Sequence, residues 1–257
     1  AFSFDEEVGC LGAPLVIDRL GTDLGPKPKL VIVGEPTDMT VVNAHKGVVC
    51  LQTRVRGLEA HSSATHRGVN AVQQAARLIG FLAELAEEMA AREASDSGFE
   101  PPCTTIQVGT VQGGTAQNIV PLDCAFTWEY RLLPGADPHE IEERFERFAN
   151  ETVLPDMHAI DPCTGIETET VCSVPGLEPD RDSPAEPVAM ALARTNRTGV
   201  VAYCTEAGQF QRAGIPAIVC GPGSIAQAHQ PDEFIELSQV RACEAFMRRL
   251  LNEVSMD

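Results

Sequence analysis

Short apolar runs, each followed at once by polar or glycine-rich residues, occur near both ends of the chain. The runs lie at residues 1–4, 30–33, 200–204 and 217–220. Continuous apolar strands of this kind are typical of a parallel sheet that is covered on both faces. Apolar residues at helical spacing lie between or after the runs, at 11–20, at 183–199 and from 238 onwards. The pattern predicts an α/β unit with a partial, open, parallel or mixed sheet, whose first strand is residues 1–4.

Two helices of this unit have recognisable sequence features. Ser183-Pro184-Ala185-Glu186 has the sequence of a capping box with proline at the first helical position, which predicts a helix that stops near Gly199. The final helix is expected to bury one apolar stripe. That stripe consists of Val240, Cys243, Phe246 or Met247, Leu250 and Val254.

The middle of the chain has a different pattern, in which apolar and polar residues alternate along half-polar strands. Strand patterns at 49–55, 106–108, 122–130 and 166–170 combine with helical patterns at 72–89 and 141–148. The order β-α-β-β-α-β predicts a ferredoxin-like unit with an antiparallel sheet. We therefore expect an incomplete catalytic domain formed by 1–47 and 174–257, with a lid and dimerisation domain, 48–173, inserted between them. Residues 92–102 are the most linker-like part of the insert.

Composition and net charge limit the kinds of molecule that the protein can bind. The chain has 37 acidic and 19 basic residues, so its formal charge is −18. This excess argues against nucleic acid and against anionic membranes as partners, and no apolar run approaches the roughly 18 residues of a membrane span. The nine cysteines are scattered, without a CxxC pair. They predict buried, reduced thiols in a cytoplasmic protein rather than a disulfide framework or a cysteine–zinc site.

The candidate catalytic and metal-binding residues follow directly after the predicted strands. Glu6 and Glu7 follow the first run, Glu35 the second and Glu206 the third, and His229 lies in the loop after the fourth. Ligands of open α/β sheets bind at the carboxyl ends of strands, and carboxylates with imidazole suit zinc, cobalt or manganese. One of two adjacent carboxylates can bind metal while the other takes a proton. The alternative for each residue is a solvated turn or a surface histidine.

Six segments in order carry a family resemblance. They are Phe4–Cys10, Gly34–Thr37, Arg56–Ser63, Gly114–Pro121, Thr205–Gly208, and Gly221–Ser224 continuing through Ala228–Glu233. Together they resemble the zinc-dependent aminoacylase/deacetylase family of metallopeptidases over the whole chain. The resemblance implies a two-metal α/β catalytic domain with an inserted ferredoxin-like lid that forms a homodimer.

The resemblance also implies roles at the metal site. Glu6 would be the general base that activates water between two zinc ions, with cobalt as a possible substitute. Glu7 and His229 would bind one metal, and Glu35 would bind the other. From charge complementarity, we expect Glu206 to meet the ammonium group of an ornithine substrate.

The lid is implied to supply three further residues. His61 would reach into the partner subunit's site and stabilise the oxyanion, and its alternative is a surface histidine at a strand end. Asn118 and Arg131 would hold the substrate, because a guanidinium fork suits an α-carboxylate. The competing interpretation of Arg131 is an exposed arginine on the polar face of its strand.

The implied activity is hydrolysis of the amide of an N-acyl amino acid. The resemblance favours N2-acetylornithine, cleaved to ornithine and acetate in arginine biosynthesis. A desuccinylase and a general aminoacylase are the alternatives within the same class, and a non-catalytic chain that dimerises through its lid is the alternative from another class.

One departure from the family pattern concerns the metal site. Family members carry, before the Asp-Glu-Glu motif, a His-x-Asp metal ligand and an aspartate that bridges both metals, and neither is found here. Two close cations need a bridging anion to offset their repulsion. We therefore expect the chain to be about the last two thirds of an enzyme, to be catalytically inert alone, to expose apolar faces and to associate.

Overall fold

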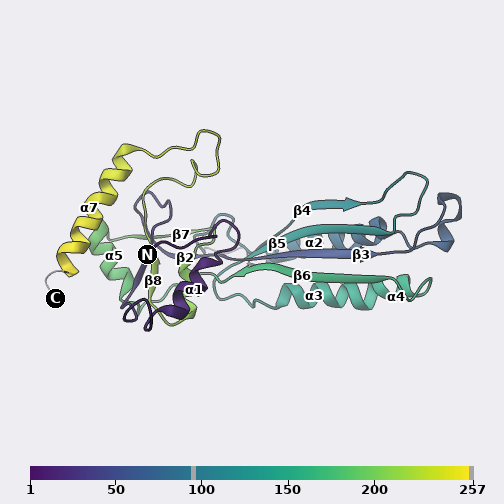
Figure 1. Cartoon of the computed structure of the whole chain (residues 1–257), viewed down its shortest axis with the longest axis horizontal. Coiled ribbons are helices and arrows are strands. Elements are labelled where there is room, and N and C mark those ends of the chain that lie inside the picture. Colours follow the sequence, from purple (N-terminus) through teal and green to yellow (C-terminus); the bar gives the residue numbers. More distant parts are fainter. Residues whose placement is uncertain (94–96, 255–257) are drawn as a thin grey trace.

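Two separate sheets organise the molecule, which is described here from a computed structural model covering residues 1–93 and 97–254 (Figure 1). We call the unit around the first sheet the base and the unit around the second sheet the arm. The base contains α1 (Gly12–Arg19), β1 (Val31–Val33), β2 (Val41–His45), α5 (Ala185–Ala193), β7 (Thr198–Val201), α6 (Ala207–Arg212), β8 (Ala217–Val219) and α7 (Leu237–Val254). The arm contains β3 (Gly47–Arg56), η1 (Ser62–Arg67), α2 (Ala71–Glu93), β4 (Thr105–Gly113), β5 (Asp123–Leu132), α3 (Glu140–Phe148), η2 (Ala149–Val153), α4 (Leu154–His158) and β6 (Gly165–Val174).

The base sheet is mixed. Its strand order is β1-β8-β2-β7, in which β1 pairs parallel with β8, β2 pairs parallel with β7, and β2 meets β8 antiparallel. The runs predicted at 30–33 and 217–220 contain β1 and β8, whereas the run predicted at 200–204 includes only the last two residues of β7. The strand predicted at residues 1–4 is wrong: these residues are exposed and form no strand. No strand among residues 1–93 and 97–254 pairs with them, and an apolar run alone cannot supply that partner.

Helices cover both faces of the base sheet, as the continuous apolar strands predicted. On one face, α1 and α6 pack on a core that includes Val33, Val42 and Val219. On the other face, α5 and α7 pack on a core that includes Val41 and Ile218. The alternate strand residues therefore serve two different cores, which is why the strands are apolar throughout.

Two predicted helix features need correction. The helix α5 ends at Ala193, because Arg194 takes a left-handed conformation with φ of 56°, six residues before the predicted stop at Gly199. Pro184 is the residue before this helix rather than its first residue. In α7 only part of the predicted stripe packs: Phe246 is buried, whereas Val240 and Met247 are exposed.

The base also exposes several large apolar side chains, as the sequence led us to expect. They are Phe2, Phe4, Leu11, Leu15, Phe234, Leu237, Val240 and Met247. In the part of the chain that the structure describes, no helix combines the length and apolar character needed to cross a membrane.

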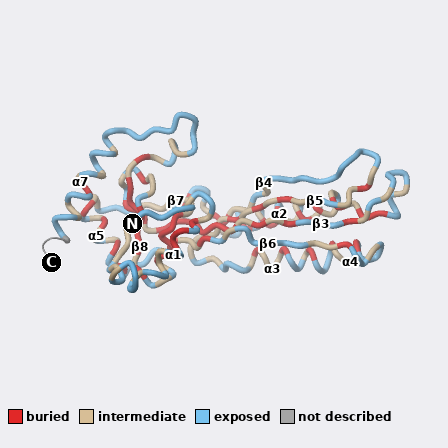
Figure 2. Tube along the Cα trace, viewed as in Figure 1, coloured by how far each residue is buried: buried red, intermediate tan, exposed pale blue. Residues whose placement is uncertain are grey.

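The arm confirms the predicted β-α-β-β-α-β order. Its four strands are antiparallel in the order β4-β5-β3-β6, and its helices lie along one face of the sheet (Figure 1). The alternation in β5 places Cys124, Phe126, Trp128 and Tyr130 in the core, where they pack on α2 and α3 (Figure 2). Helix α2 continues to Glu93, so the predicted linker at 92–102 begins later than expected, and its residues 94–96 lie outside the described part.

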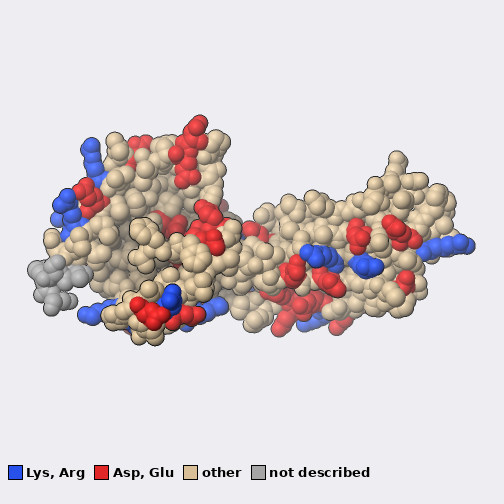
Figure 3. Space-filling view, viewed as in Figure 1, with Lys and Arg blue, Asp and Glu red and all other residues tan. Residues whose placement is uncertain are grey.

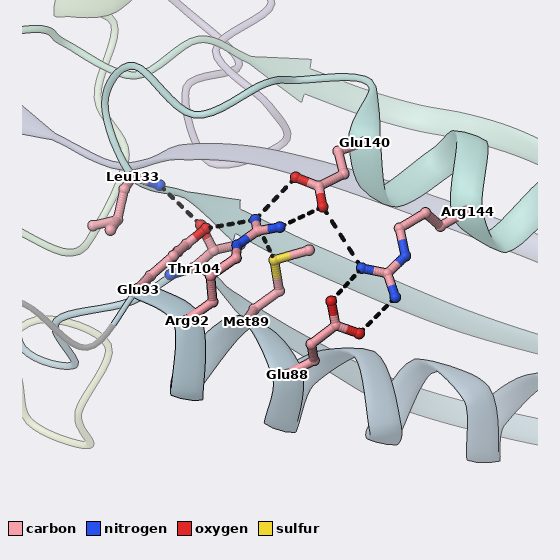
Figure 4. A network of polar contacts seen from close by, with 8 residues as sticks. All are labelled: Glu88, Met89, Arg92, Glu93, Thr104, Leu133, Glu140 and Arg144. Atoms are coloured by element: carbon pink, nitrogen blue, oxygen red, sulfur yellow. Dashed lines mark hydrogen bonds and ion pairs between the residues drawn. The ribbon is translucent and has the colours of Figure 1, made fainter.

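A polar network joins α2 to α3 at the arm surface (Figure 4). Arg144 binds Glu88 through two hydrogen bonds of 2.6 and 2.7 Å, and Arg92 binds Glu140 at 2.6 and 2.9 Å. Glu93 on the same helix accepts a bond from the backbone N–H of Thr104. The pairs are partly exposed, so they fix the helix register more than they stabilise the fold.

The base and arm meet where two chain segments cross between them. After β2, His45 exchanges backbone hydrogen bonds with Leu177, next to the segment that returns from β6. The buried Lys46 ammonium donates to the backbone oxygens of Pro101 and Cys103, which ties the arm loop to this junction. Gly208 permits close contact here, because a Cβ at that position would lie 2.2 Å from the oxygen of Pro175.

Candidate functional site

An acidic turn at the start of the chain presents the first two candidate carboxylates. The backbone N–H groups of Gly9 and Cys10 both donate to the carbonyl oxygen of Glu6, at 3.1 and 2.9 Å. This turn leads directly into α1. It leaves the Glu6 side chain half-buried and the Glu7 side chain exposed.

Glu35 follows β1 and lies in a tightly packed loop. Thr37 fixes the loop, because its hydroxyl contacts the backbone of Thr40 and Gly221. A Cβ on Gly221 would lie 2.4 Å from the backbone of Gly34, so a side chain cannot be accommodated there. Burial, followed by the charges of Glu6 and Glu206, raises the pKa of Glu35 to about 7.

Glu206 reaches the same region by a different route from the one the sequence suggested. Since β7 runs antiparallel to β1 and β8, a common strand direction does not place Glu206 beside Glu35. The segment from Ala202 to Thr205 brings it there, and Tyr203 within this segment donates its hydroxyl to the carbonyl of Pro36 at 3.1 Å. Glu206 is buried at the start of α6, and its Oε1 atom has no hydrogen-bond partner in the described part of the chain.

His229 lies in the long loop after β8 and faces the acidic turn. Its Nε2 atom is 3.7 Å from Oε2 of Glu7, and both side chains are largely exposed. The residue takes a left-handed conformation with φ of 59°, and its backbone N–H donates to Glu233 at 3.0 Å. The sequence-predicted pair of Glu7 and His229 is therefore brought together by two segments that are distant in the chain.

The carboxylates are crowded. Burial first, then Glu7, raises the pKa of Glu6, and Glu206 adds to this rise while His229 opposes it. Acidic side chains also gather over this part of the base and over α3 of the arm on the face shown in Figure 3. Such a cluster is short of positive charge, which a bound cation would supply.

The side chains of this cluster carry the kinds of ligand atom that bind a divalent cation. They offer carboxylate oxygens and one imidazole nitrogen, and the buried, unpartnered oxygen of Glu206 adds a further acceptor nearby. The geometry is less complete: among residues 1–93 and 97–254, no three His, Cys, Asp or Glu side chains are grouped as a metal site requires. The pair of Glu7 and His229 is the part that already has a suitable separation.

The predicted arm residues lie away from this cluster. His61 and Asn118 are both exposed in the two loops at the far tip of the arm, where their segments are joined by a backbone bond from Ser62 to Asn118 (Figure 1). The His61 ring accepts a hydrogen bond at Nδ1 from the backbone N–H of Ser63. In the neutral ring, the proton is then on Nε2.

Arg131 lies at the other end of β5, close to the base, and is separated from Asn118 by the length of the strand. Its Nε atom donates to Glu129 at 3.1 Å. The structure thus brings His61 and Asn118 together but does not bring Arg131 to them.

Sequence reasoning missed several polar groups beside the carboxylates. Tyr203 was assigned only to a strand, yet burial and the charge of Glu35 raise its pKa to about 12. The Cys10 thiol donates to Oε1 of Glu6 at 3.6 Å, and Cys204 packs against the apolar cluster that contains Cys10. Their spacing in the sequence gives no indication of this, because the two cysteines lie 194 positions apart and only the fold brings them into one cluster.

Comparison with known proteins gives a match for the arm. Residues 43–157 match the family described as the peptidase dimerisation domain. This range begins in β2 and ends in α4, so it covers most of the arm but not β6.

Comparison with curated proteins covers nearly the whole chain. The chain is 36% identical over 246 residues to an acetylornithine deacetylase of Myxococcus xanthus, which covers 95% of this chain and 62% of that protein. It is 30% identical to an acetylornithine deacetylase of Salmonella arizonae, over 96% of this chain and 62% of that protein. The chain therefore spans 62% of the length of these curated relatives.

Solved structures support the fold. A tripeptidase from Staphylococcus aureus matches 99% of this chain and 63% of its own, with a TM-score of 0.67 and 20% identity. An aminopeptidase from Bacillus cereus matches 95% of this chain and 61% of its own, with a TM-score of 0.66 and 21% identity. At these identities the likeness concerns the arrangement of the base and arm.

Proposed function

Because the chain belongs to the aminoacylase/deacetylase family of metallopeptidases, we propose that it is a metal-dependent hydrolase of the amide bond of N-acyl amino acids. The observation that carries this proposal is the convergence of Glu6, Glu35 and Glu206 with the pair of Glu7 and His229. The names of the curated relatives support N2-acetylornithine as the substrate, and ornithine and acetate as the products. This reaction belongs to arginine biosynthesis, and the predicted cytoplasmic location remains a prediction.

In the proposed site, Glu7 and His229 hold one divalent cation and Glu35 holds a second, with zinc as the metal and cobalt as a substitute. A bound cation supplies Lewis acidity, which polarises the amide carbonyl and offsets the crowded negative charge. Glu6 acts as the general base. Its half-buried position and raised pKa suit a group that takes a proton from water and returns it to the leaving amine.

Two sets of residues bind and orient the substrate in this proposal. Glu206 meets the side-chain ammonium of ornithine, because its unpartnered oxygen is buried and carries the charge that complements this group. From the arm, His61 donates its Nε2 proton to the oxyanion, as its Nδ1 atom is occupied by Ser63. Asn118 and Arg131 bind the substrate's polar groups.

The position of His61 supports a homodimer. The loop after β3, which contains His61, lies at the tip of the arm, at the opposite end of the molecule from the N-terminus and α1 (Figure 1), so in this proposal His61 serves a site in a second copy rather than its own. The match of residues 43–157 to the peptidase dimerisation domain supports the same assembly. We propose that the arm is the lid and dimerisation domain, and that the base is the catalytic domain.

Release of the acyl group from a panel of substrates tests the proposal. The purified protein is assayed with N2-acetylornithine, N-succinyl-diaminopimelate and longer N-acyl amino acids, with zinc or cobalt and again with a chelator. We expect metal-dependent release of acetate, with N2-acetylornithine preferred. Glu6→Gln is expected to lower kcat by about 10²-fold or more, whereas Glu151→Gln on the arm surface is the matched control. A preference for the succinyl substrate would assign a desuccinylase instead.

A non-catalytic, dimerising chain is the second candidate. It is favoured by the finding that the described residues form no complete three-ligand metal group, while the arm is fully folded. A protein that dimerises in light scattering but hydrolyses no substrate in either metal would support this candidate and contradict the first.

A further inference from the structure

His45 lies at the junction between the base and the arm, and neither the proposed metal site nor the proposed substrate contacts use it. It is the last residue of β2, and its side chain is fully buried. Both nitrogens of its ring have a polar partner. Nδ1 is 2.9 Å from the backbone oxygen of Lys46, and Nε2 is 3.0 Å from the hydroxyl oxygen of Thr205. The orientation of this buried ring is therefore fixed from both sides.

The two partners determine which ring nitrogen carries the proton. The carbonyl of Lys46 can only accept, so Nδ1–H donates to it, and Nε2 of the neutral ring accepts the hydroxyl proton of Thr205. Burial lowers the pKa of His45 to about 4, so the ring is neutral at neutral pH. The hydroxyl oxygen of Thr205 in turn accepts the backbone N–H of Ala207 at 3.0 Å. The result is a continuous chain of hydrogen bonds from the junction to the start of α6.

This chain of bonds ends around Glu206. Glu206 lies between Thr205 and Ala207, so the bond that joins these two residues closes a turn around its backbone. The carbonyl of Glu206 also accepts the backbone N–H of Gln209 at 3.0 Å. The Glu206 side chain is 9% exposed, and its Oε1 atom has no hydrogen-bond partner among the residues that the structure describes. The direction of this oxygen therefore depends on the backbone that Thr205 holds.

We propose that His45 is a positioning residue for substrate selectivity, an inference that rests on the proposed function. Through the Thr205 hydroxyl, His45 holds the Glu206 carboxylate in the orientation that receives the side-chain ammonium group of an amino acid. Without the ring acceptor, the Thr205 hydroxyl is free to rotate, and the turn around Glu206 loosens. A charge-assisted hydrogen bond depends on a fixed geometry, so the preference for a cationic side chain over a neutral one should fall.

A purely structural role is the alternative, in which His45 only stabilises the junction. Two substitutions of His45 separate the two roles. Asparagine keeps a donor near the position of Nδ1 but has no acceptor near Nε2, whereas the longer glutamine places an amide oxygen near Nε2, where it accepts from Thr205. Both variants lose the ring, so a structural role predicts similar effects. The proposed role predicts that only His45→Asn loses selectivity.

The tautomer of His45 tests the chain of bonds in the wild-type protein, without a variant that could fail to fold. Two-bond proton–nitrogen NMR spectra distinguish a protonated ring nitrogen from an acceptor nitrogen. The signal of His45 is the one, among those of the six histidines, that disappears in His45→Gln. We expect a neutral ring with its proton on Nδ1, and a shift of the Nε2 resonance in Thr205→Val. A proton on Nε2 would overturn the proposal.

Calorimetry with L-ornithine and L-norvaline, which lacks the ammonium group, tests the effect on Glu206 without requiring catalysis. Wild type in zinc should bind ornithine at least about tenfold more tightly than norvaline. Thr205→Val and His45→Asn should each lower this ratio at least about fivefold, whereas Thr205→Ser and His45→Gln should keep it within about twofold. Thr53→Val, which removes a buried, hydrogen-bonded hydroxyl from the arm core, is the matched control and should keep the ratio too.

The outcomes separate this proposal from the proposed function. An unchanged ratio in folded Thr205→Val, or a wild type without a preference for ornithine, would overturn the positioning role. Equal losses in His45→Asn and His45→Gln, or a loss in Thr53→Val, would assign a structural role and overturn it as well. The expected ratios in a protein that hydrolyses no N-acyl amino acid would support the positioning role and contradict only the proposed hydrolysis.

Discussion

Replacing Glu35 by glutamine is expected to stabilise the metal-free protein above neutral pH. Burial and neighbouring carboxylates raise the pKa of Glu35 from 4.5 to about 7 in the folded state. The folded state therefore binds this proton more tightly than the unfolded state does. Its stabilising effect is fully present below about pH 4.5 and is lost as the pH rises through about 7. Glutamine cannot ionise, so it avoids the loss.

The magnitude follows from the size of the rise. A change from 4.5 to about 7 corresponds to at most about 3 kcal/mol of stability at high pH. Water reaches the half-exposed carboxyl and screens it, so we expect about 1 to 2 kcal/mol at pH 8. For a chain of this size, that raises Tm by about 2 to 6 °C.

Thermal unfolding in the presence of a chelator measures this effect. Wild type, Glu35→Gln and the control Glu151→Gln are compared at pH 4.5 and at pH 8. The Glu35→Gln variant should match wild type at the lower pH and exceed it at the higher one. Saturating zinc should reverse the order at pH 8, because wild type gains more binding energy than the variant. A Glu35→Gln variant that is less stable than wild type at pH 8 in chelator would refute the crowding argument.

Three further predictions concern the rest of the fold. Burial lowers the pKa of His45 to about 4. Wild type should therefore lose up to about 3 kcal/mol of stability relative to His45→Gln as the pH falls from 6.5 towards 4. Stability curves that run parallel over this pH range for the two proteins would contradict the prediction. Leu82→Ala removes a fully buried side chain between α2 and the arm sheet. Denaturant unfolding should show a free energy of unfolding lower by about 2 to 4 kcal/mol. A decrease below about 1 kcal/mol would show that the arm core is loosely packed. Arg144→Gln breaks the partly exposed ion pairs with Glu88 and Glu140. The free energy of unfolding should fall by less than about 1 kcal/mol at low salt, and by still less at high salt. A decrease that does not depend on salt would contradict a surface ion pair.

The arm could be predicted in detail because its signals are local. The alternation from Cys124 to Tyr130 has the period of a strand, and one face of that strand meets helices. The same alternation fixes the pairing register, since a slip by one residue would expose Trp128 and its neighbours. Antiparallel neighbours and a helix on one face then leave few alternatives for the topology.

The base was predicted less completely because its arrangement depends on distant segments. Residues 1–4 have an apolar pattern but no strand beside them, so the local pattern is not sufficient. The direction of β7 relative to β8 also depends on pairing through β2, which no short window of sequence contains. In α7, Val240 has the expected spacing for burial, yet its side chain is exposed.

The candidate site was predicted by residue type and place rather than by geometry. The sequence indicated that Glu35 and Glu206 would be neighbours, but the route to Glu206 runs through the segment after β7 and not along a shared strand direction. It could not indicate Tyr203 or the apolar cluster that Cys10 and Cys204 share, because apolar strands and buried thiols have the same sequence character. The roles assigned to His61, Asn118 and Arg131 stay predictions.

Zinc binding measured by calorimetry tests the central claim, which is that the carboxylate cluster and His229 form a divalent-metal site. Wild type is titrated with zinc beside Glu7→Gln, Glu35→Gln, His229→Ala and the control Glu151→Gln. We predict that each of the three site variants binds zinc at least about tenfold more weakly than wild type, while the control is unchanged. Equal affinity in all five proteins, or no zinc binding by a folded wild type, would contradict the account.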